Sequence, residues 1–300
     1  MLIQYLRSFL ISRILLYSSF LVFSQDNDTV RIGIFTDCQY CDCVESGIRY
    51  YKLSLAKLDS CIAEFNSFPL DAVFHLGDMI DHDYKSFDSV LPRFRQFKAP
   101  LNLVLGNHDY MIKTEYRGDL TSHIGMKEKY YRVDLGNWSF IVLDGNDLSC
   151  FAPQSKKQKK ERNEMIWDLF SSMRLNGMPW NGGIGSDQMQ WLDNQLSEAQ
   201  KEKRKVAVLC HFALDAKYDH NLYNNREIIR LLAGYPCVKA YFNGHYHPGG
   251  YSEINGIHLV SFHGMVNTKQ NAYAIVTLTS DSILIDGYGR EPDRRLKIQK

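Results

Sequence analysis

Seven polar side chains in this 300-residue sequence have the chemistry and the spacing of metal ligands. They follow short apolar runs of the kind that form buried strands, so polar donors recur where predicted strands end. Because the carboxyl ends of strands in α/β sheets form the ligand crevice, we expect these side chains to converge on one rim. They are carboxylate or amide oxygens and imidazole nitrogens, from Asp37, Gln39, Asp78, Asn107, His211, His245 and His247.

This donor set suits manganese, iron or zinc better than calcium. Seven ligands are too many for one ion, but they suit two ions roughly 3.5–4 Å apart, the arrangement used for phosphate ester hydrolysis. Glycines precede Asp78, Asn107 and His245, where they would let the backbone turn tightly. Each motif alone has an ordinary structural explanation, such as a buried core histidine or an Asx turn. Their occurrence together, after successive strands, favours a di-metal hydrolase.

The elements that must position these donors are strands alternating with helices. Helical periodicity predicts helices over 48–65, 87–97, 161–173, 187–199 and 226–233. The alternation implies parallel pairing, and the strand-rich C-terminal third implies an additional antiparallel sheet. The charged run 154–162 is interpreted as a solvated helix face or an exposed loop. Strands are predicted over 30–35, 71–76, 101–105, 139–144, 206–210, 238–242, 257–262, 272–279 and 282–288.

Five motifs together resemble those of the calcineurin-like metallophosphoesterases. The resemblance extends over nearly the whole chain that follows the N-terminal segment. It implies an α/β fold, the four-layer α/β/β/α sandwich with mixed sheets. It also implies a single domain over residues 27–300, with a cap-like insertion around 150–185. The motifs are Asp37-x-Gln39, GDMID (77–81), GNHD (106–109), His211 and GHYH (244–247).

Gln39 departs from the usual family pattern, in which a histidine stands two residues after the first aspartate. Together with NGGIGSDQMQWL (181–192), GHYHPGGY (244–251) and GYGREPDR (287–294), it makes the chain similar to the manganese-dependent ADP-ribose/CDP-alcohol diphosphatase branch. This resemblance implies hydrolysis of the pyrophosphate bond in nucleoside diphosphate conjugates such as ADP-ribose and CDP-choline. An amide is a weaker donor than imidazole, so we expect Gln39 to favour manganese over zinc.

The resemblance also implies a role for each donor. Asp37, Gln39, Asp78 and His247 would hold one ion, and Asp78 would bridge to the second, which Asn107, His211 and His245 complete. A bridging water of lowered pKa would attack one phosphorus in line as hydroxide. We expect His108 to face the scissile phosphate and Asp109 to orient its imidazole, unless Asp109 only caps a turn. Asp81 is expected to orient a ligand histidine or to brace the loop.

Three residues are candidate substrate contacts. Tyr40 and Trp180 are candidates for stacking on a base, and Arg290 is a candidate for pairing with a phosphate. Packing or a surface ion pair would explain these residues equally well. Two other functions stay open: another phosphoesterase, acting on cyclic nucleotides or phosphomonoesters, and a non-catalytic nucleotide-binding module. Complete retention of the donors and of His108 argues against the module.

Composition and charge indicate partners and compartment. Lys plus Arg number 35 against 34 for Asp plus Glu, and a net charge of +1 favours neither nucleic acid nor a membrane surface as partner. Residues 1–24 combine basic positions with a short apolar run before a polar boundary, which is typical of a secretory signal peptide. A secreted or periplasmic protein is therefore expected; a retained N-terminal membrane anchor is the alternative. Nothing in the sequence indicates the oligomeric state.

Three cysteines crowd the segment DCQYCDC (37–43), and the chain has seven in all. A structural zinc site needs four ligands, and Cys38-x-x-Cys41 supplies one pair for which no second Cys/His pair is free. Local packing is the favoured interpretation. A local disulfide is compatible with an oxidising compartment, but the sequence does not indicate which cysteines would form it.

Overall fold

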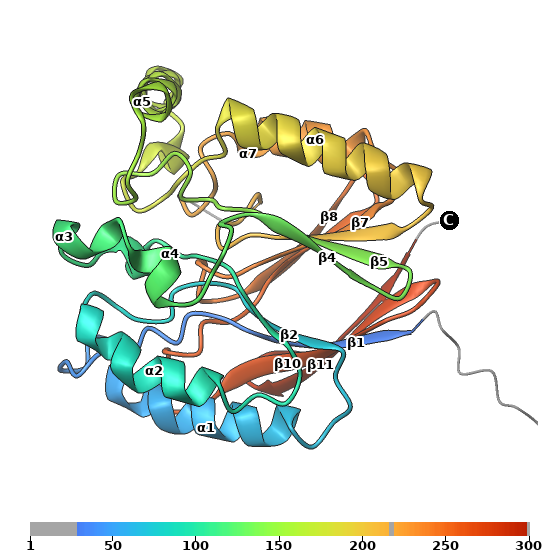
Figure 1. The fold of residues 1–300 in the computed structure, drawn as a ribbon. Coiled ribbons are helices and arrows are strands. Elements are labelled where there is room, and N and C mark those ends of the chain that lie inside the picture. Colours follow the sequence, from blue (N-terminus) through green and yellow to red (C-terminus); the bar gives the residue numbers. More distant parts are fainter. Residues whose placement is uncertain (1–28, 216–218, 299–300) are drawn as a thin grey trace, which may run out of the picture.

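The structure, a computed structural model, describes residues 29–215 and 219–298, which build two six-stranded sheets (Figure 1). In the first sheet the strand order is β12-β11-β10-β1-β2-β3. β1 pairs in parallel with β2, and β2 with β3, while β10 to β12 continue from β1 as antiparallel neighbours. The strands are β1 (Val30–Phe35), β2 (Ala72–His75), β3 (Leu101–Leu103), β10 (Ala272–Leu278), β11 (Ser282–Gly289) and β12 (Arg294–Lys297).

The second sheet has the order β4-β5-β6-β7-β9-β8. Its four inner strands, β5, β6, β7 and β9, run parallel, and β4 and β8 close the two edges as antiparallel partners. The strands are β4 (Tyr131–Leu135), β5 (Trp138–Val142), β6 (Lys205–Leu209), β7 (Val238–Asn243), β8 (Gly250–Ile254) and β9 (Ile257–Ser261).

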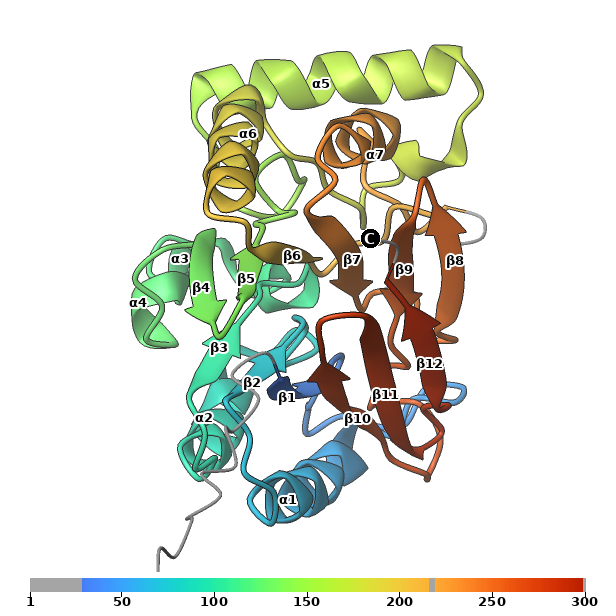
Figure 2. The same ribbon diagram turned by 90° about the vertical axis from the view of Figure 1, so that its right-hand side faces the viewer.

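Apolar side chains hold the layers together. Between the sheets, Phe74 of β2 stacks on Phe140 of β5 with ring centroids 5.1 Å apart, within one buried core. A second core joins the first sheet to helices α1 (Ser54–Phe65) and α2 (Phe87–Phe94), and a third joins the second sheet to α6 (Ser186–Lys201) and α7 (Asn225–Ala233). Helices thus cover both outer faces, as Figures 1 and 2 show. The predicted four-layer α/β/β/α fold with mixed sheets is confirmed.

The remaining helices lie around the carboxyl ends of the strands. They are α3 (Thr114–Arg117), α4 (Leu120–His123) and α5 (Lys156–Ser171), with short 3-10 turns at Tyr51–Leu53, Tyr84–Ser86, His108–Tyr110 and Leu175–Gly177. α5 begins five residues earlier than predicted, because Ser155 and Gln158 form a reciprocal capping box inside the charged run. α1 begins at Ser54 instead of 48, after a 3-10 turn.

The expected additional antiparallel sheet is wrong. β10 to β12 extend the first sheet beyond β1, and β8 and β9 extend the second sheet beyond β7. Three strands were also missed: β4, β8 and β12. Each is an edge strand with half-buried or exposed positions, so its sequence lacks the apolar run of a central strand.

The predicted signal peptide or anchor, residues 1–24, lies outside the described residues, so export stays a prediction. Across 29–215 and 219–298, none of the helices combines the length and the apolar character that crossing a membrane requires. The stretch 150–185 contains α5 and the turn Leu175–Gly177; its role as a cap stays a prediction.

Candidate metal centre

The seven predicted donors come together where the carboxyl edges of both sheets meet. Segments after β1, β2 and β3 of the first sheet carry four of them, and segments after β6 and β7 of the second sheet carry the three histidines. The single predicted rim is therefore built from the strand ends of both sheets. All seven are at most 8% exposed: Asp37, Gln39, Asp78, Asn107, His211, His245 and His247.

One group of donors surrounds Gln39. Its Nε2 donates to Asp78 Oδ2 at 2.9 Å and lies 3.4 Å from His247 Nε2. His247 Nε2 in turn lies 3.1 Å from Asp37 Oδ1. A second group surrounds His211, whose Nε2 is 3.3 Å from Asp78 Oδ2 and 3.1 Å from Asn107 Oδ1. Asp78 belongs to both groups, which is the position that a bridging ligand needs.

Each histidine has one ring nitrogen held from outside the group. His211 Nδ1 lies 2.8 Å from the carbonyl oxygen of Leu76. His245 Nε2 lies 2.9 Å from Asn181 Oδ1, and His247 Nδ1 lies 3.0 Å from Asn267 Oδ1. An acceptor at one nitrogen keeps the proton there and leaves the other nitrogen free to bind an ion.

Asn181 and Asn267 are functional residues that sequence reasoning missed. Both are buried, at 0% and 5% exposure. Asn181 belongs to the NGG sequence noted for its resemblance, but Asn267 lies six residues past the end of β9 and stands in no recognised motif. Only the structure shows that Asn181 orients His245 and that Asn267 orients His247.

Charge complementarity at the centre is strong. Burial opposes ionisation of Asp78, but His211 and His108 hold the pKa of its carboxyl well below the usual range. Burial likewise opposes protonation of His211, yet Asp78 raises its pKa to about 9. Burial and the neighbouring His211 lower the pKa of His245 well below its usual range. The centre therefore combines the ionised carboxylate of Asp78 with a neutral imidazole at His245, both ready to bind a cation, whereas an ion bound by His211 would have to displace the proton that Asp78 holds on that ring.

Two buried oxygen atoms test whether cations fit here. Gln39 Oε1 is buried without a hydrogen-bond partner, and so is Asp37 Oδ1, because His247 Nε2, 3.1 Å away, carries no proton when Nδ1 donates to Asn267. Such atoms are costly, because a buried acceptor without a partner loses its hydration and gains nothing in return. Divalent cations bound by oxygen and imidazole donors would satisfy both atoms, so the residues present fit a metal centre.

The backbone around the donors is held in an uncommon conformation. Asp37, Gln39, Asp78 and His245 all have positive φ, between 41° and 62°, where side chains other than glycine are disfavoured. Gly77 also has a positive φ, as its predicted role in a tight turn requires. Gly106 instead allows the loop after β3 to approach Asp78 closely, because a Cβ at this position would lie 2.0 Å from Asp78 Oδ1.

His108 lies beside the centre, and Asp81 orients it. His108 Nδ1 is 3.0 Å from Asp81 Oδ1 and 2.9 Å from the carbonyl oxygen of Asp81. The expected pairing of Asp109 with His108 is wrong. The carboxylate of Asp109 accepts hydrogen bonds from the backbone amides of Asp78, Met79 and Gly106, so it braces the two loops that carry donors.

A cavity of about 300 Å³ opens over the centre. Trp180 lines it, as expected of a substrate contact, whereas Tyr40 and Arg290 are not among the lining residues. Tyr40 packs at the edge of the core between the first sheet and its helices, and Arg290 donates to the carbonyl oxygen of Gly264 at 2.6 Å. Beyond the donors and His108, the lining residues are Arg49, Met111, Phe151, Pro179, Trp180 and His220.

The cysteine-rich segment after β1 contains a disulfide between Cys41 and Cys43. Cys41 is 3% exposed and packs against Tyr51 and Val266. Cys38 remains a buried free thiol, so local packing and a local disulfide both occur here.

Comparison with known proteins agrees with this geometry. The chain is 27% identical to the manganese-dependent ADP-ribose/CDP-alcohol diphosphatase of Homo sapiens, over 89% of this chain and 92% of the human protein. It is 28% identical to the mouse protein of the same name, with 89% and 93% covered. Among solved structures, a dimetal phosphatase from Danio rerio has the same fold, with a TM-score of 0.81 and 22% identity over 91% of this chain and 100% of that chain.

The family model for calcineurin-like phosphoesterases matches residues 30–249. That range begins with β1 and ends just after His247, so it includes all seven donors together with His108 and Asp81. The predicted family is confirmed: the chain belongs to the calcineurin-like phosphoesterases.

Proposed function

We propose that this protein is a metal-dependent phosphohydrolase that cleaves the pyrophosphate bond of nucleoside diphosphate conjugates. One observation carries the proposal: six buried donors form two groups that share Asp78 beneath a cavity, and the ring of His245 lies beside them, with its centroid 5.0 Å from that of His211. The names of the curated relatives, which cover most of this chain, support ADP-ribose and CDP-alcohols as the substrate class.

Asp37, Gln39, Asp78 and His247 would hold one divalent ion, and Asp78, Asn107, His211 and His245 the second, with manganese as the preferred metal. Two such ions supply an activated water nucleophile and neutralise phosphate charge. The chain's own part is to keep the two carboxylates ionised and every donor oriented. Asn181, Asn267 and the carbonyl of Leu76 do so for the three histidines.

His108 is placed to act on the substrate directly. It lines the cavity, its side chain is 15% exposed, and Nδ1 is engaged by Asp81. Because the two ring nitrogens lie on opposite sides of the imidazole, Nε2 points away from Asp81 and is available for a phosphate oxygen. A hydrogen bond from Nε2 to the leaving oxygen would stabilise the charge that develops there and then protonate it.

The rest of the cavity suits a nucleoside diphosphate. Arg49 offers a cation that can pair with a phosphate oxygen away from the metal centre, and Phe151 and Trp180 offer aromatic surfaces for a base. A monoester would leave these residues without a partner. The cavity therefore favours a diphosphate over a simple phosphomonoester.

A substrate panel tests the proposal. The manganese-loaded protein should hydrolyse ADP-ribose to AMP and ribose 5-phosphate, and CDP-choline to CMP and phosphocholine, with one water consumed per bond. Products would be identified by chromatography. Hydrolysis of p-nitrophenyl phosphate or a cyclic nucleotide, with no hydrolysis of either diphosphate, would show that another phosphoesterase activity is the right one.

Replacing His108 separates catalysis from binding. His108→Ala should leave bound manganese unchanged and lower turnover of ADP-ribose by a factor of about 10² or more. If the wild-type protein binds manganese and ADP-ribose but hydrolyses neither diphosphate, it is the non-catalytic binding module instead. Unchanged turnover in His108→Ala would remove the role assigned to this residue.

A further inference from the structure

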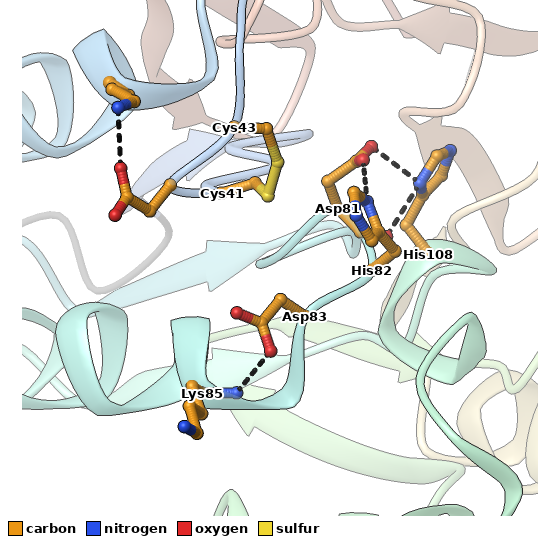
Figure 3. The surroundings of a disulfide bond; sticks show 9 residues. Cys41, Cys43, Asp81, His82, Asp83, Lys85 and His108 are labelled. Carbon is orange, nitrogen blue, oxygen red and sulfur yellow. Dashed lines mark hydrogen bonds and ion pairs between the residues drawn. A yellow bond between two sulfur atoms is a disulfide. The ribbon is translucent and has the colours of Figure 1, made fainter.

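A second cluster of metal-binding side chains lies next to the candidate metal centre. The sulfur atoms of Cys41 and Cys43 and a ring nitrogen of His82 all lie within 4.8 Å of one another. The two cysteines come from the loop after β1, and His82 comes from the loop after β2. Figure 3 shows the three side chains together, beside Asp81 and His108.

The chemistry of this cluster differs from that of the candidate metal centre. Thiolates select soft or borderline ions such as zinc, whereas the seven donors of the centre are oxygens and imidazoles. In a tetrahedral zinc site, bonds of about 2.0–2.3 Å place two ligands roughly 3.3–3.8 Å apart. In the cluster the two sulfurs are bonded to each other and the ring nitrogen lies within 4.8 Å of both, so the sulfurs reach that spacing only after the disulfide is reduced and they move apart.

His82 has a carboxylate partner, as metal-ligating histidines commonly do. Its Nδ1 contacts Asp81 Oδ2. A carboxylate at one ring nitrogen fixes the ring and directs the other nitrogen outward, as in the carboxylate–histidine–zinc triads of known sites. Asp81 Oδ1 is at the same time 3.0 Å from His108 Nδ1, so one carboxylate holds both imidazoles.

The cluster has room for an exchangeable ligand. Cys41, Cys43 and His82 line a cavity of about 670 Å³ together with Asp83, Lys85 and Tyr116, among others. Met111 lines both this cavity and the one over the metal centre, so the two adjoin. Three protein ligands facing a cavity leave the fourth position of a tetrahedral ion to water.

We propose that Cys41 and Cys43, once reduced, form with His82 a binding site for a thiophilic divalent cation such as Zn²⁺. A dithiol reductant transfers two electrons to the disulfide, the S–S bond breaks, two thiols form, and the reductant becomes a disulfide. Zn²⁺ then replaces the two thiol protons, which pass to solvent. The disulfide is the form that cannot bind the ion.

Occupancy of this site should also change turnover. Asp81 links His82 to His108, so an ion on His82 alters the carboxylate that orients the catalytic imidazole. This second part rests on the proposed phosphohydrolase function, whereas binding of the ion does not.

Cobalt binding tests the site without any activity. The purified protein is reduced with a dithiol, freed of reductant and metals, and titrated with Co²⁺ under anaerobic conditions. Thiolates bound to Co²⁺ give an intense charge-transfer absorption that the seven donors of the metal centre, none of them a thiol, do not give. We expect this band in the reduced protein, its loss on addition of Zn²⁺, and its absence from the oxidised protein.

Variants assign the band to its residues. Cys43→Ser should abolish it, Cys150→Ser should retain it because Cys150 is an exposed cysteine outside the cluster, and His82→Ala should weaken cobalt affinity at least tenfold. A thiol count confirms reduction, since the chain has seven cysteines. No band in a protein with seven free thiols, or a band that survives in Cys43→Ser, would overturn the site.

An activity assay tests the coupling separately. One equivalent of Zn²⁺ should change ADP-ribose turnover of the reduced, manganese-loaded protein at least twofold, and Cys43→Ser should not respond. An equal response in both proteins would place the zinc effect at the metal centre and refute the coupling. If neither protein hydrolyses a diphosphate, the proposed function fails, while the cobalt result still decides the site.

Discussion

Two aspartates near His108 have roles that differ from those predicted from the sequence. Asp81 contacts the imidazole, and Asp109 accepts hydrogen bonds from three backbone amides. Sequence adjacency is a poor guide here, because neighbouring side chains in a 3-10 turn such as His108–Tyr110 point in different directions. The side chain that orients His108 comes from the previous strand end instead.

Asp81→Asn should therefore lower turnover by about tenfold or more, because a neutral amide orients and stabilises a charged imidazole less well than a carboxylate does. Bound manganese should not change. Steady-state kinetics and metal analysis check this, with Asp88→Asn on the exposed face of α2 as the control. Loss of metal in Asp81→Asn would mean that Asp81 supports the donors instead of His108.

Gly106→Ala tests how closely the loops after β2 and β3 approach. The new methyl would lie 2.0 Å from Asp78 Oδ1, which displaces the shared carboxylate. We expect manganese affinity to fall at least tenfold. Gly118→Ala is the matched control, because nothing lies within 4 Å of a Cβ at that position. Equal manganese affinities in the two variants would contradict this account.

Helices take part in the metal centre through loops that they hold in place. Lys57 of α1 is 4% exposed and donates to the carbonyl oxygens of Met265 at 2.6 Å, Asn267 at 3.2 Å and Thr268 at 2.6 Å. Asn267 is the residue that orients His247. A helix on the outer face of the first sheet thus sets the position of a histidine that follows a strand of the second.

Lys57→Met would remove the ammonium and leave three carbonyl groups, two of them in buried residues, without this donor. We expect the free energy of unfolding to fall by about 3 kcal/mol and manganese affinity to fall as His247 loses its support. Denaturant unfolding and metal titration measure the two effects. Lys52→Met, at a lysine whose side chain is 63% exposed, should change stability by less than about 0.5 kcal/mol. A similar small effect at Lys57 would contradict the role given to it.

The end of β5 is tied to α6 at Asp144. Gln188 accepts from the backbone amide of Asp144 at 2.8 Å and donates to its carbonyl oxygen at 3.0 Å. Burial raises the pKa of the Asp144 carboxyl to about 6, against about 4 in an unfolded chain. The folded state then holds the proton more tightly, so this group's contribution to stability falls as pH rises from 4 to 6.

Asp144→Asn should remove this decrease in stability with rising pH, because the amide never ionises. Its oxygen can still accept a hydrogen bond from the backbone N–H of Asn146. The difference in unfolding free energy between variant and wild type should grow by about 2 kcal/mol in favour of the variant from pH 4 to pH 7. Urea unfolding at both pH values measures it. A difference that does not change with pH would show that Asp144 ionises as easily in the fold as in the unfolded chain.

Much of the architecture could be predicted because central strands and metal ligands leave plain patterns. The apolar runs that became β1, β2, β6 and β7 end in polar donors, and those donors do meet. Edge strands such as β4 left weaker patterns, since one face is solvated. Pairing between distant strands was not readable at all: β10 joins β1, about 240 residues earlier in the chain, through main-chain hydrogen bonds that no side-chain pattern encodes.

The two sheets are joined by their cores and also by the donors, since the first sheet provides Asp37 and Asp78 while the second provides His211 and His247. Ions bound between them should therefore stabilise the whole molecule. At a manganese concentration of 100 times the dissociation constant, the gain is about 2.7 kcal/mol.

Thermal unfolding with manganese and with a chelator should show this as a higher melting temperature in the metal-bound protein. Asp78→Asn removes the shared carboxylate and should abolish most of the shift. If chelation leaves the melting temperature of the wild type unchanged, the ions do not bind where the donors of the two sheets meet.

The positive φ angles of Asp37, Gln39, Asp78 and His245 bear on how this enzyme can evolve. Each costs of order 1 kcal/mol, and together they approach the stability of a marginal domain. Substitution by glycine at these positions would relieve the backbone strain and raise the free energy of unfolding, but it would remove the metal ligands. Selection for stability alone would thus tend to remove the metal centre. A relative that carries glycine at one of these positions is expected to be more stable and to have lost its metal-dependent activity.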